Sequence, residues 1–276
     1  MSLRRKLKSL WKTFQNLFDN MRTNLVKPKV KPEVKAEVSS DDGVLDMVIA
    51  FDTTGSMSSY IGAVKDHVTE LVPKLFKANP NLRLGVVAFG DYCDMPSKDN
   101  FGKAYQVLNL TNDEEKIINF VKKAQNTNGG DGDEFYELVI KKIVEETNWR
   151  EGSTKAVLLI ADANPHRVGY SYRDRVNNNQ INWREEAKKA AEKGIKFDTL
   201  TITLASWYKE LSEMTNGISA PFKSSGKTSQ LVEAAAMSRG CKMAKEMYRA
   251  TMDSVMMDSD EEMKAVYLAY SKEVVS

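Results

Sequence analysis

Short runs rich in apolar residues alternate along most of this chain with longer stretches in which apolar residues recur at helical spacing. The short runs predict strands at residues 45–51, 82–89, 103–108, 155–161 and 196–204, with a last edge strand at 221–223. The longer stretches predict helices at 58–78, 113–125, 134–147, 183–193, 207–215 and 229–252. This alternation indicates an α/β fold: a Rossmann-like, doubly wound, mostly parallel sheet with helices on both faces.

The two ends of the chain follow other patterns. Residues 1–26 carry one apolar stripe and an excess of basic residues, which predicts a basic amphipathic helix. Residues 27–42 combine lysine, proline and glutamate and predict an extended linker. We therefore divide the chain into this helix, the linker, an α/β domain at 43–250 and an acidic C-terminal tail or helix at 251–276.

The role of the N-terminal helix stays open at the sequence level. With Trp11, Phe14 and Phe18 on its apolar side, it could lie on an anionic membrane surface. It could also bind a groove on a partner, pair with a second copy in a homo-oligomer, or fold back on its own domain. The acidic tail could pair with the basic helix of another subunit or form a solvated helix.

Charge and cysteine content narrow the function classes. The net charge is +2, but the basic excess lies in residues 1–38, so the remaining domain is acidic and repels nucleic-acid phosphates. Two cysteines, Cys93 and Cys241, are too few for a disulfide framework. The sequence also shows no signal-peptide pattern and no apolar run near the roughly 20 residues that span a bilayer. We expect a cytoplasmic protein that does not bind nucleic acid.

A candidate metal-binding loop follows the first predicted strand. Its sequence is Asp52-Thr53-Thr54-Gly55-Ser56, and it lies where ligands bind in such sheets, beyond the carboxyl end of a strand. Asp52 offers a carboxylate, and two hydroxyl side chains follow on the same side of the turn, with Gly55 between them. Hard oxygen ligands of this kind suit Mg²⁺ or Mn²⁺. The alternative interpretation is an Asp and a Ser that cap the following helix.

The stretch 45–63 resembles the first strand and metal loop of von Willebrand factor A (VWA) domains, as found in integrin inserted domains. Residues 83–92 are similar to the second strand and acidic turn of that family, and 128–134 to its second metal-facing loop in the Gly-Gly-Asp subgroup. Residues 156–166 resemble the fourth strand and third loop, and 211–217 the late helix and its glycine turn. The resemblance covers roughly residues 43 to 250, with the motifs in the family's order.

The resemblance implies a metal-ion-dependent adhesion site (MIDAS). By it, the metal residues, direct or through water, are Asp52, Thr54, Ser56 and Asp162. Many members add a threonine from the second loop, but here that loop reads Gly130-Asp131-Gly132-Asp133 with no threonine in register. Asp131 is therefore the predicted substitute, with Asp133 and Thr127 as alternatives. The implied function is a divalent-cation-dependent protein-binding module whose Mg²⁺ or Mn²⁺ coordinates an Asp or Glu of a partner.

Two other function classes remain as alternatives. The domain could be a scaffold in an assembly, with the two ends of the chain driving oligomers. A metal-dependent phosphohydrolase is the other, but the loop lacks a second early aspartate, and the chain lacks the full Gly-x-x-x-x-Gly-Lys-Ser/Thr phosphate loop. No Ser-His-Asp or Cys-His pairing emerges either, so the sequence predicts a protein that is not an enzyme.

Two features near the predicted third loop have competing interpretations. His166 could orient a metal-bound water, although a lone loop histidine is more often a polar surface or hydrogen-bonding group. Residues 167–182 form a long polar segment with tyrosines and arginines, residue types that are favoured in binding interfaces. We expect this segment to overhang the metal loop and to select an acidic partner; the alternative is a flexible loop.

Overall fold

The computed structural model of the protein describes residues 43–203 and 205–275. The N-terminal helix and the linker, with their membrane and oligomer alternatives, therefore lie outside the described residues. The strands are β1 (Leu45–Asp52), β2 (Leu82–Phe89), β3 (Tyr105–Thr111), β4 (Asp133–Glu134), β5 (Thr154–Ala161), β6 (Asn164–Pro165), β7 (Ile195–Thr201) and β8 (Ser219–Pro221). The α-helices are α2 (Ser58–Ala78), α3 (Glu114–Lys123), α4 (Tyr136–Glu146), α5 (Trp183–Glu192), α6 (Ser206–Met214), α7 (Thr228–Arg239), α8 (Lys242–Met256) and α9 (Glu261–Val275).

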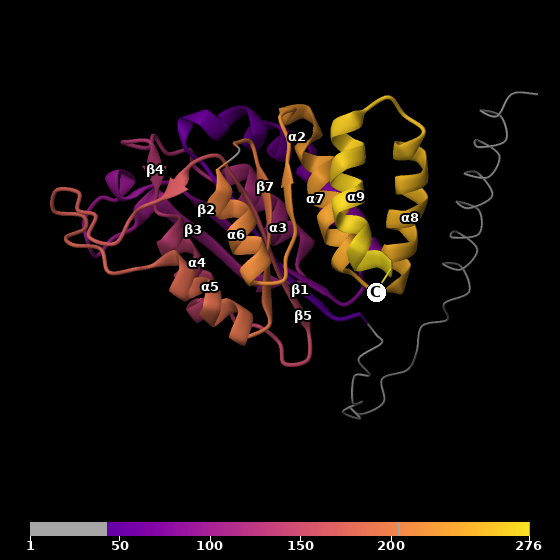
Figure 1. Ribbon diagram of the computed structural model, residues 1–276, viewed down its shortest axis with the longest axis horizontal. Coiled ribbons are helices and arrows are strands. Elements are labelled where there is room, and N and C mark those ends of the chain that lie inside the picture. Colours follow the sequence, from indigo (N-terminus) through magenta and orange to yellow (C-terminus); the bar gives the residue numbers. More distant parts are fainter. Residues whose placement is uncertain (1–42, 204, 276) are drawn as a thin grey trace, which may run out of the picture. The chain divides into compact units, whose positions relative to one another are not determined.

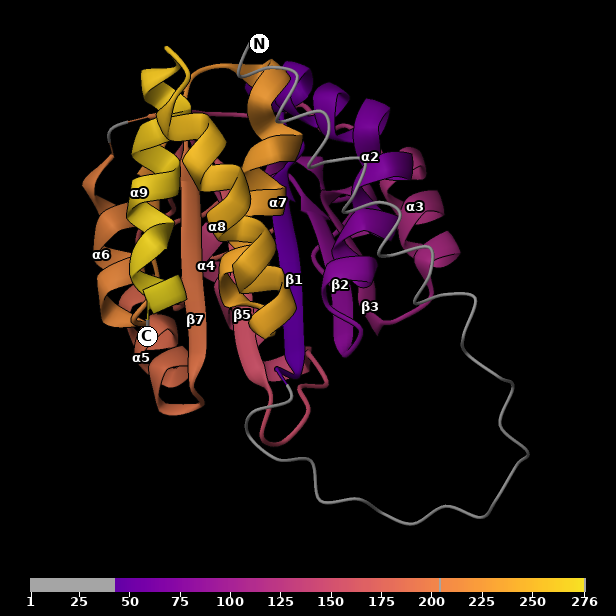
Figure 2. The same cartoon turned by 90° about the vertical axis from the view of Figure 1, so that its right-hand side faces the viewer.

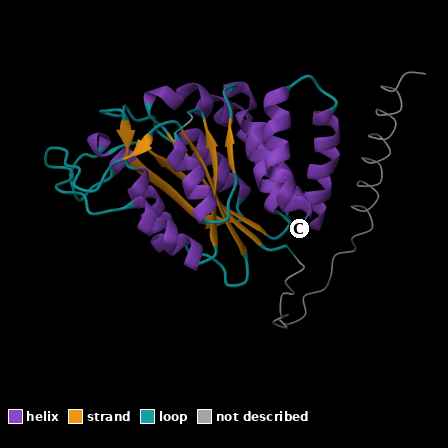
Figure 3. Cartoon of the chain, viewed as in Figure 1, coloured by secondary structure: helices purple, strands orange, loops and turns teal. Residues whose placement is uncertain are grey.

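Six of the strands form one sheet in the order β3-β2-β1-β5-β7-β8 (Figures 1 and 3). All neighbours are parallel except β2 and β3, which are antiparallel. The mostly parallel α/β sheet predicted from the sequence is thus confirmed. Because β1 lies between β2 and β5 and runs parallel to both, the loops that follow these three strands meet at one edge of the sheet.

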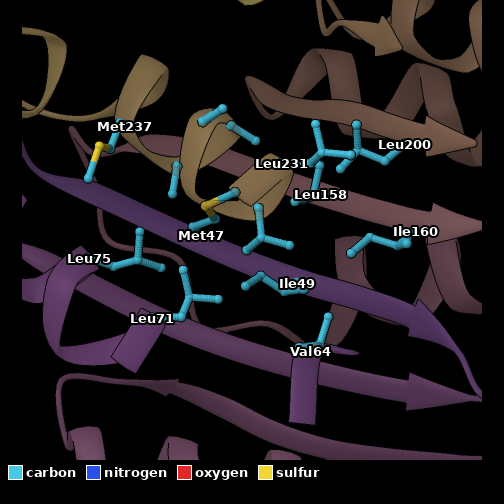
Figure 4. Close-up of a cluster of buried hydrophobic side chains, with 14 of the residues drawn as sticks. Met47, Ile49, Val64, Leu71, Leu75, Leu158, Ile160, Leu200, Leu231 and Met237 are labelled. Carbon is cyan, nitrogen blue, oxygen red and sulfur yellow. The ribbon is translucent and has the colours of Figure 1, made fainter. Parts of the chain in front are cut away.

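Helices cover both faces of the sheet. One apolar core joins alternate residues of β1 to α2, α3 and α7, and a second joins the intervening residues to α4, α5 and α6. Figure 4 shows the first core, in which Met47 and Ile49 of β1 lie among side chains of α2 and α7 such as Leu71 and Met237. Burial on both faces explains why β1 reads as an uninterrupted apolar run.

The prediction of a single closing helix over 229–252 is wrong. α7 ends at Arg239 and α8 begins at Lys242, with Gly240 and Cys241 between them. Asn79 enters this break: its Oδ1 accepts a hydrogen bond from the Cys241 N–H at 3.0 Å. A β-carbon at Gly240 would lie 1.8 Å from the same Oδ1, so only glycine lets the chain pass Asn79.

The C-terminal segment is a packed helix rather than a solvated one. α8 continues through residue 250, where we had divided the domain from the tail. α9 then returns beside it and packs against α7, burying Met263, Val266, Tyr267 and Tyr270 (Figure 2). α7 is itself fixed to the sheet by a buried ion pair in which Arg239 Nη2 lies 2.6 Å from Asp198 Oδ1 of β7. Within the described residues, no helix is both long and apolar enough to cross a membrane.

Candidate metal centre

The loop after β1 brings three oxygen-bearing side chains together. Asp52 Oδ1 accepts hydrogen bonds from the Thr54 N–H at 2.8 Å and from Thr54 Oγ1 at 2.7 Å. Thr54 Oγ1 lies 3.4 Å from Ser56 Oγ. Asp52 and Thr54 are buried whereas Ser56 is exposed, so the group opens to solvent on one side. The helix-cap interpretation fails because α2 begins without a side-chain cap.

Asp162 approaches this group from the neighbouring strand. It follows β5, which pairs in parallel register with β1, so both loops lie at the same edge of the sheet. Its Oδ1 is buried and has no hydrogen-bond partner among the described residues. A buried carboxylate oxygen without a donor is costly, and a cation would supply the missing partner. The residues present therefore fit a bound divalent cation.

Electrostatics at Asp52 points the same way. Its side chain is fully buried, and burial raises its pKa to about 7, an effect to which the charge of Asp162 adds. Hydrogen bonds from Thr54 and Tyr136 oppose the shift without cancelling it. Two carboxylates that repel each other in a dry site favour either a proton or a metal ion between them.

Tyr136, the first residue of α4, connects the first and third loops and was missed by sequence reasoning. Its hydroxyl donates to Asp52 Oδ2 at 2.6 Å and accepts from the Ala163 N–H at 3.2 Å. The Ala163 carbonyl accepts two further bonds, from Trp207 Nε1 at 2.9 Å and the Tyr208 hydroxyl at 2.7 Å. These three aromatic side chains lie in mutual contact beneath the loops and fix the position of the residue after Asp162.

The three residues predicted from the second loop lie in different environments. Thr127 is buried, and its hydroxyl lies 2.9 Å from Thr53 Oγ1, so it supports the back of the metal loop. Asp131 is exposed, and its Oδ2 accepts a hydrogen bond from the Tyr170 hydroxyl at 3.0 Å. Asp133 Oδ1 lies 3.5 Å from the Asn164 side-chain amide. Within the described residues, none of the three forms a hydrogen bond with Asp52; these bonds go to Thr53, Tyr170 and Asn164 instead.

Glu134 is the second-loop carboxylate that interacts with Asp52. Burial raises its pKa to about 10, and the charges of Asp52, Asp91, Asp94 and Asp131 add to the shift, in that order. Its Oε2 is buried and has no hydrogen-bond partner within the described part of the chain. The short β4–β6 pairing places Glu134 opposite Pro165, next to the loop that carries Asp162.

Glycine at position 129 makes room for this carboxylate. A β-carbon there would lie 2.8 Å from Glu134 Oε1, and the residue has φ +69°, a conformation that favours glycine. The sequence carried a signal that we did not use: Glu134 is the last charged residue before the apolar Phe135 and Tyr136, and so lies where the loop enters the core.

His166 and the segment after it are ordered parts of the site. His166 is a buried hydrogen-bonding group rather than a surface group: it is 2% exposed, and its Nε2 lies 2.6 Å from Asp91 Oδ1. Residues 167–182 turn back on themselves, with hydrogen bonds from the Gly169 N–H to the Asn179 carbonyl and from the Tyr172 N–H to the Val176 carbonyl. The buried Asn179 side chain anchors the segment. It therefore presents a defined surface beside the second loop.

The sequence model of the von Willebrand factor type A domain matches residues 46–234. The chain belongs to this family. The match ends within α7, so α8 and α9 form a helical hairpin beyond the VWA match.

Solved structures agree at the level of the fold. The pilus adhesin SpaC of Lactobacillus rhamnosus GG superimposes with a TM-score of 0.54 and 17% identity, covering 73% of this chain and 31% of the adhesin. An open conformation of the same adhesin gives 0.51 and 14% identity, covering 73% and 30%. A putative ariadne-like RING finger protein of Acanthamoeba polyphaga mimivirus is 21% identical over 126 residues, or 46% of this chain and 12% of that protein. The chain thus spans less than a third of each relative.

Proposed function

We propose that this VWA domain binds a protein partner through a divalent cation, Mg²⁺ or Mn²⁺, whose coordination shell a partner's Asp or Glu completes. The cation would be held by Asp52, Thr54, Ser56 and Asp162, with Glu134 in place of Asp131 as the carboxylate from the second loop. The observation that carries the proposal is the buried, unpartnered Asp162 Oδ1 beside a buried Asp52 whose pKa is raised to about 7.

The open side of the group suits a protein ligand. Ser56 and Gly55 are exposed, so the face of the cation on that side would be occupied by water until a partner arrives. A carboxylate is the group that displaces such a water most readily, because it carries the charge that a hard cation prefers. The VWA fold is commonly a protein-interaction or adhesion module, and the adhesin neighbours share it.

The segment 167–182 supplies a surface for partner selection. Arg167, Val168 and Arg173 are exposed, and Val168 is 49% exposed although it is apolar. Two exposed arginines and an exposed apolar side chain on one segment would favour a ligand that has both acidic and apolar residues. The Tyr170 hydroxyl, bonded to Asp131, ties this surface to the second loop.

Calorimetry with Mg²⁺ and Mn²⁺ tests the metal part of the proposal. Asp52→Ala and Asp162→Ala are expected to abolish Mg²⁺ binding at this centre by removing a carboxylate ligand, and Ser56→Ala to weaken it. Asp99→Asn, an exposed acidic residue on the loop after β2, is the matched control and should bind as the wild type does. Unchanged affinity in Asp52→Ala would refute the site.

A pull-down from the native source tests the partner. The wild type should retain a protein in Mg²⁺ and release it in EDTA, whereas Asp52→Ala should not retain it. Arg173→Ala should weaken retention while leaving cation affinity unchanged. Retention that persists in EDTA would favour the scaffold alternative instead. We further propose a binding rather than a catalytic role, and phosphatase turnover that requires Mg²⁺ and Asp52 would overturn that statement.

A further inference from the structure

A second group of metal-ligating side chains lies beside the metal centre and has no part in the function proposed above. Asp91 follows β2, Asp131 belongs to the second loop, and His166 follows β6, so three separate segments contribute. Their ligand atoms, two carboxylate oxygens and an imidazole nitrogen, all lie within 4.8 Å of one another. Asp91 and His166 are buried, whereas Asp131 is exposed, so the group has a fixed inner side and an outer side open to solvent.

Neighbouring side chains hold each of the three residues in place. The Tyr170 hydroxyl donates to Asp131 Oδ2, and the Tyr170 ring stacks on the His166 ring with centroids 3.7 Å apart. The backbone N–H of His166 donates a hydrogen bond to Glu137 Oε2 at 3.1 Å. Asp91 Oδ2 accepts a weak hydrogen bond from the Cys93 N–H at 3.4 Å, so its Oδ1 is left to face His166. Such outer contacts are what orients ligands around a metal ion.

Glu134, the carboxylate assigned above to the metal centre, also lies within the excess negative charge of this group. It is 5% exposed, and its Oε2 has no hydrogen-bond partner among the described residues. Its carboxylate feels the charges of Asp91, Asp94 and Asp131 as well as that of Asp52. Lys103, whose Nζ lies 4.0 Å from Asp94, offsets only one of these. Even a protonated His166 would leave the group negative.

We propose that Asp91, Asp131 and His166 form a second divalent-cation site next to the metal centre. Carboxylates suit Mg²⁺, Ca²⁺ and Mn²⁺, whereas imidazole suits Zn²⁺ and other transition metals. A set with both ligand types therefore selects Mn²⁺ or Zn²⁺ over Mg²⁺. The metal loop offers oxygen ligands alone, so the two sites differ in chemistry and can be told apart.

Pulsed electron paramagnetic resonance on the Mn²⁺-loaded full chain provides the test, because it detects an imidazole nitrogen bound to Mn²⁺. The chain has two histidines, His166 and His67, and His67 is exposed on α2. Nitrogen coupling should appear in the wild type, persist in His67→Gln and Asp52→Ala, and disappear in His166→Gln. Absence of the coupling in the wild type, or its persistence in His166→Gln, overturns the proposal.

Mn²⁺ stoichiometry by native mass spectrometry adds a measurement that does not depend on a buried substitution. We expect two ions in the wild type and one in Asp131→Asn, an exposed position whose replacement should leave the fold intact. Asp52→Ala should also retain one ion. If the wild type binds one ion, and Asp52→Ala loses that ion while Asp131→Asn keeps it, the second site is refuted and the metal loop is not. The reverse result supports the second site and refutes the metal loop.

Discussion

Asp52→Asn is expected to stabilise the metal-free protein at alkaline pH while abolishing Mg²⁺ binding at the metal centre. A carboxyl group whose pKa is higher in the folded than in the unfolded chain binds its proton more tightly when folded. Stability is therefore greatest below the unfolded pKa and is lost as pH rises through the folded one. Folding raises the pKa of Asp52 from 3.8 to about 7, a difference of about three pH units. At pH 8 this difference lowers the free energy of unfolding by about 4 kcal/mol.

The amide removes this cost but loses part of the hydrogen bonding. Its oxygen can still accept from the Thr54 N–H and hydroxyl, as Asp52 Oδ1 does. Its NH₂ group must replace Oδ2, which accepts from the Tyr136 hydroxyl, so that hydroxyl has to turn. This rearrangement costs about 1–2 kcal/mol. The net gain is then about 2–3 kcal/mol, or roughly 4–12 °C in Tm for a domain of this size.

Urea unfolding in EDTA at pH 8 and pH 5, with and without Mg²⁺, checks this expectation. The variant should be the more stable protein at pH 8 in EDTA, and its advantage should vanish at pH 5, where the wild-type carboxyl is protonated. Mg²⁺ should stabilise the wild type at pH 8 and leave the variant unchanged. A variant that is less stable than the wild type at pH 8, or that gains equally from Mg²⁺, would refute the reasoning.

Three further substitutions probe the site and its support. Glu134→Gln should raise the stability of the metal-free protein at pH 8, because the pKa of Glu134 is raised to about 10, and should weaken Mn²⁺ binding about tenfold or more in calorimetry. Gly240→Ala should destabilise the protein by about 2 kcal/mol or more in urea unfolding, because the new β-carbon would collide with Asn79 Oδ1. Arg239→Met should cost about 3–5 kcal/mol in the same assay by leaving the buried Asp198 without its cation.

Each of these has a control in the same fold. Gly226→Ala places a β-carbon in open space and should change stability little, so an equal loss there would contradict the steric account of Gly240. Lys116→Met breaks an exposed ion pair with Asp113 and should leave the stability nearly unchanged. Glu115→Gln removes an exposed helical carboxylate and should leave Mn²⁺ affinity unchanged.

The helices and strands whose apolar residues follow one regular spacing could be predicted closely. α2 was predicted at 58–78, the range observed, because a single apolar stripe faces the sheet. β1 and β5 were found within one residue because both are buried on both faces. The break at Gly240 was missed because it depends on Asn79, which lies 161 residues earlier and enters only in the folded chain. The spacing of apolar residues along the sequence does not indicate such a long-range contact.

The metal loop was visible in the sequence because its oxygens lie within five consecutive residues. Asp162 was assigned through the family resemblance, and the parallel pairing of β1 with β5 shows why the two loops meet. The second loop was harder, because its backbone is set by tertiary contacts: Asp94 Oδ1 and Oδ2 accept the N–H groups of Asn128 and Gly129 at 2.9 and 3.1 Å. Those contacts leave Glu134 inside and Asp131 outside, an order that loop spacing alone does not encode.

The concentration of carboxylates at this edge follows from the same topology that makes the fold stable. Parallel strands bring the loops after β1, β2 and β5 to one place, and each of those loops carries an aspartate. Without cations the buried members must take up protons or repel one another, as the raised pKa values of Asp52 and Glu134 show. Cation binding would remove that repulsion. The same repulsion would thus raise the affinity for the metal and lower the stability of the metal-free protein. A substitution that stabilises the metal-free protein should therefore weaken metal binding.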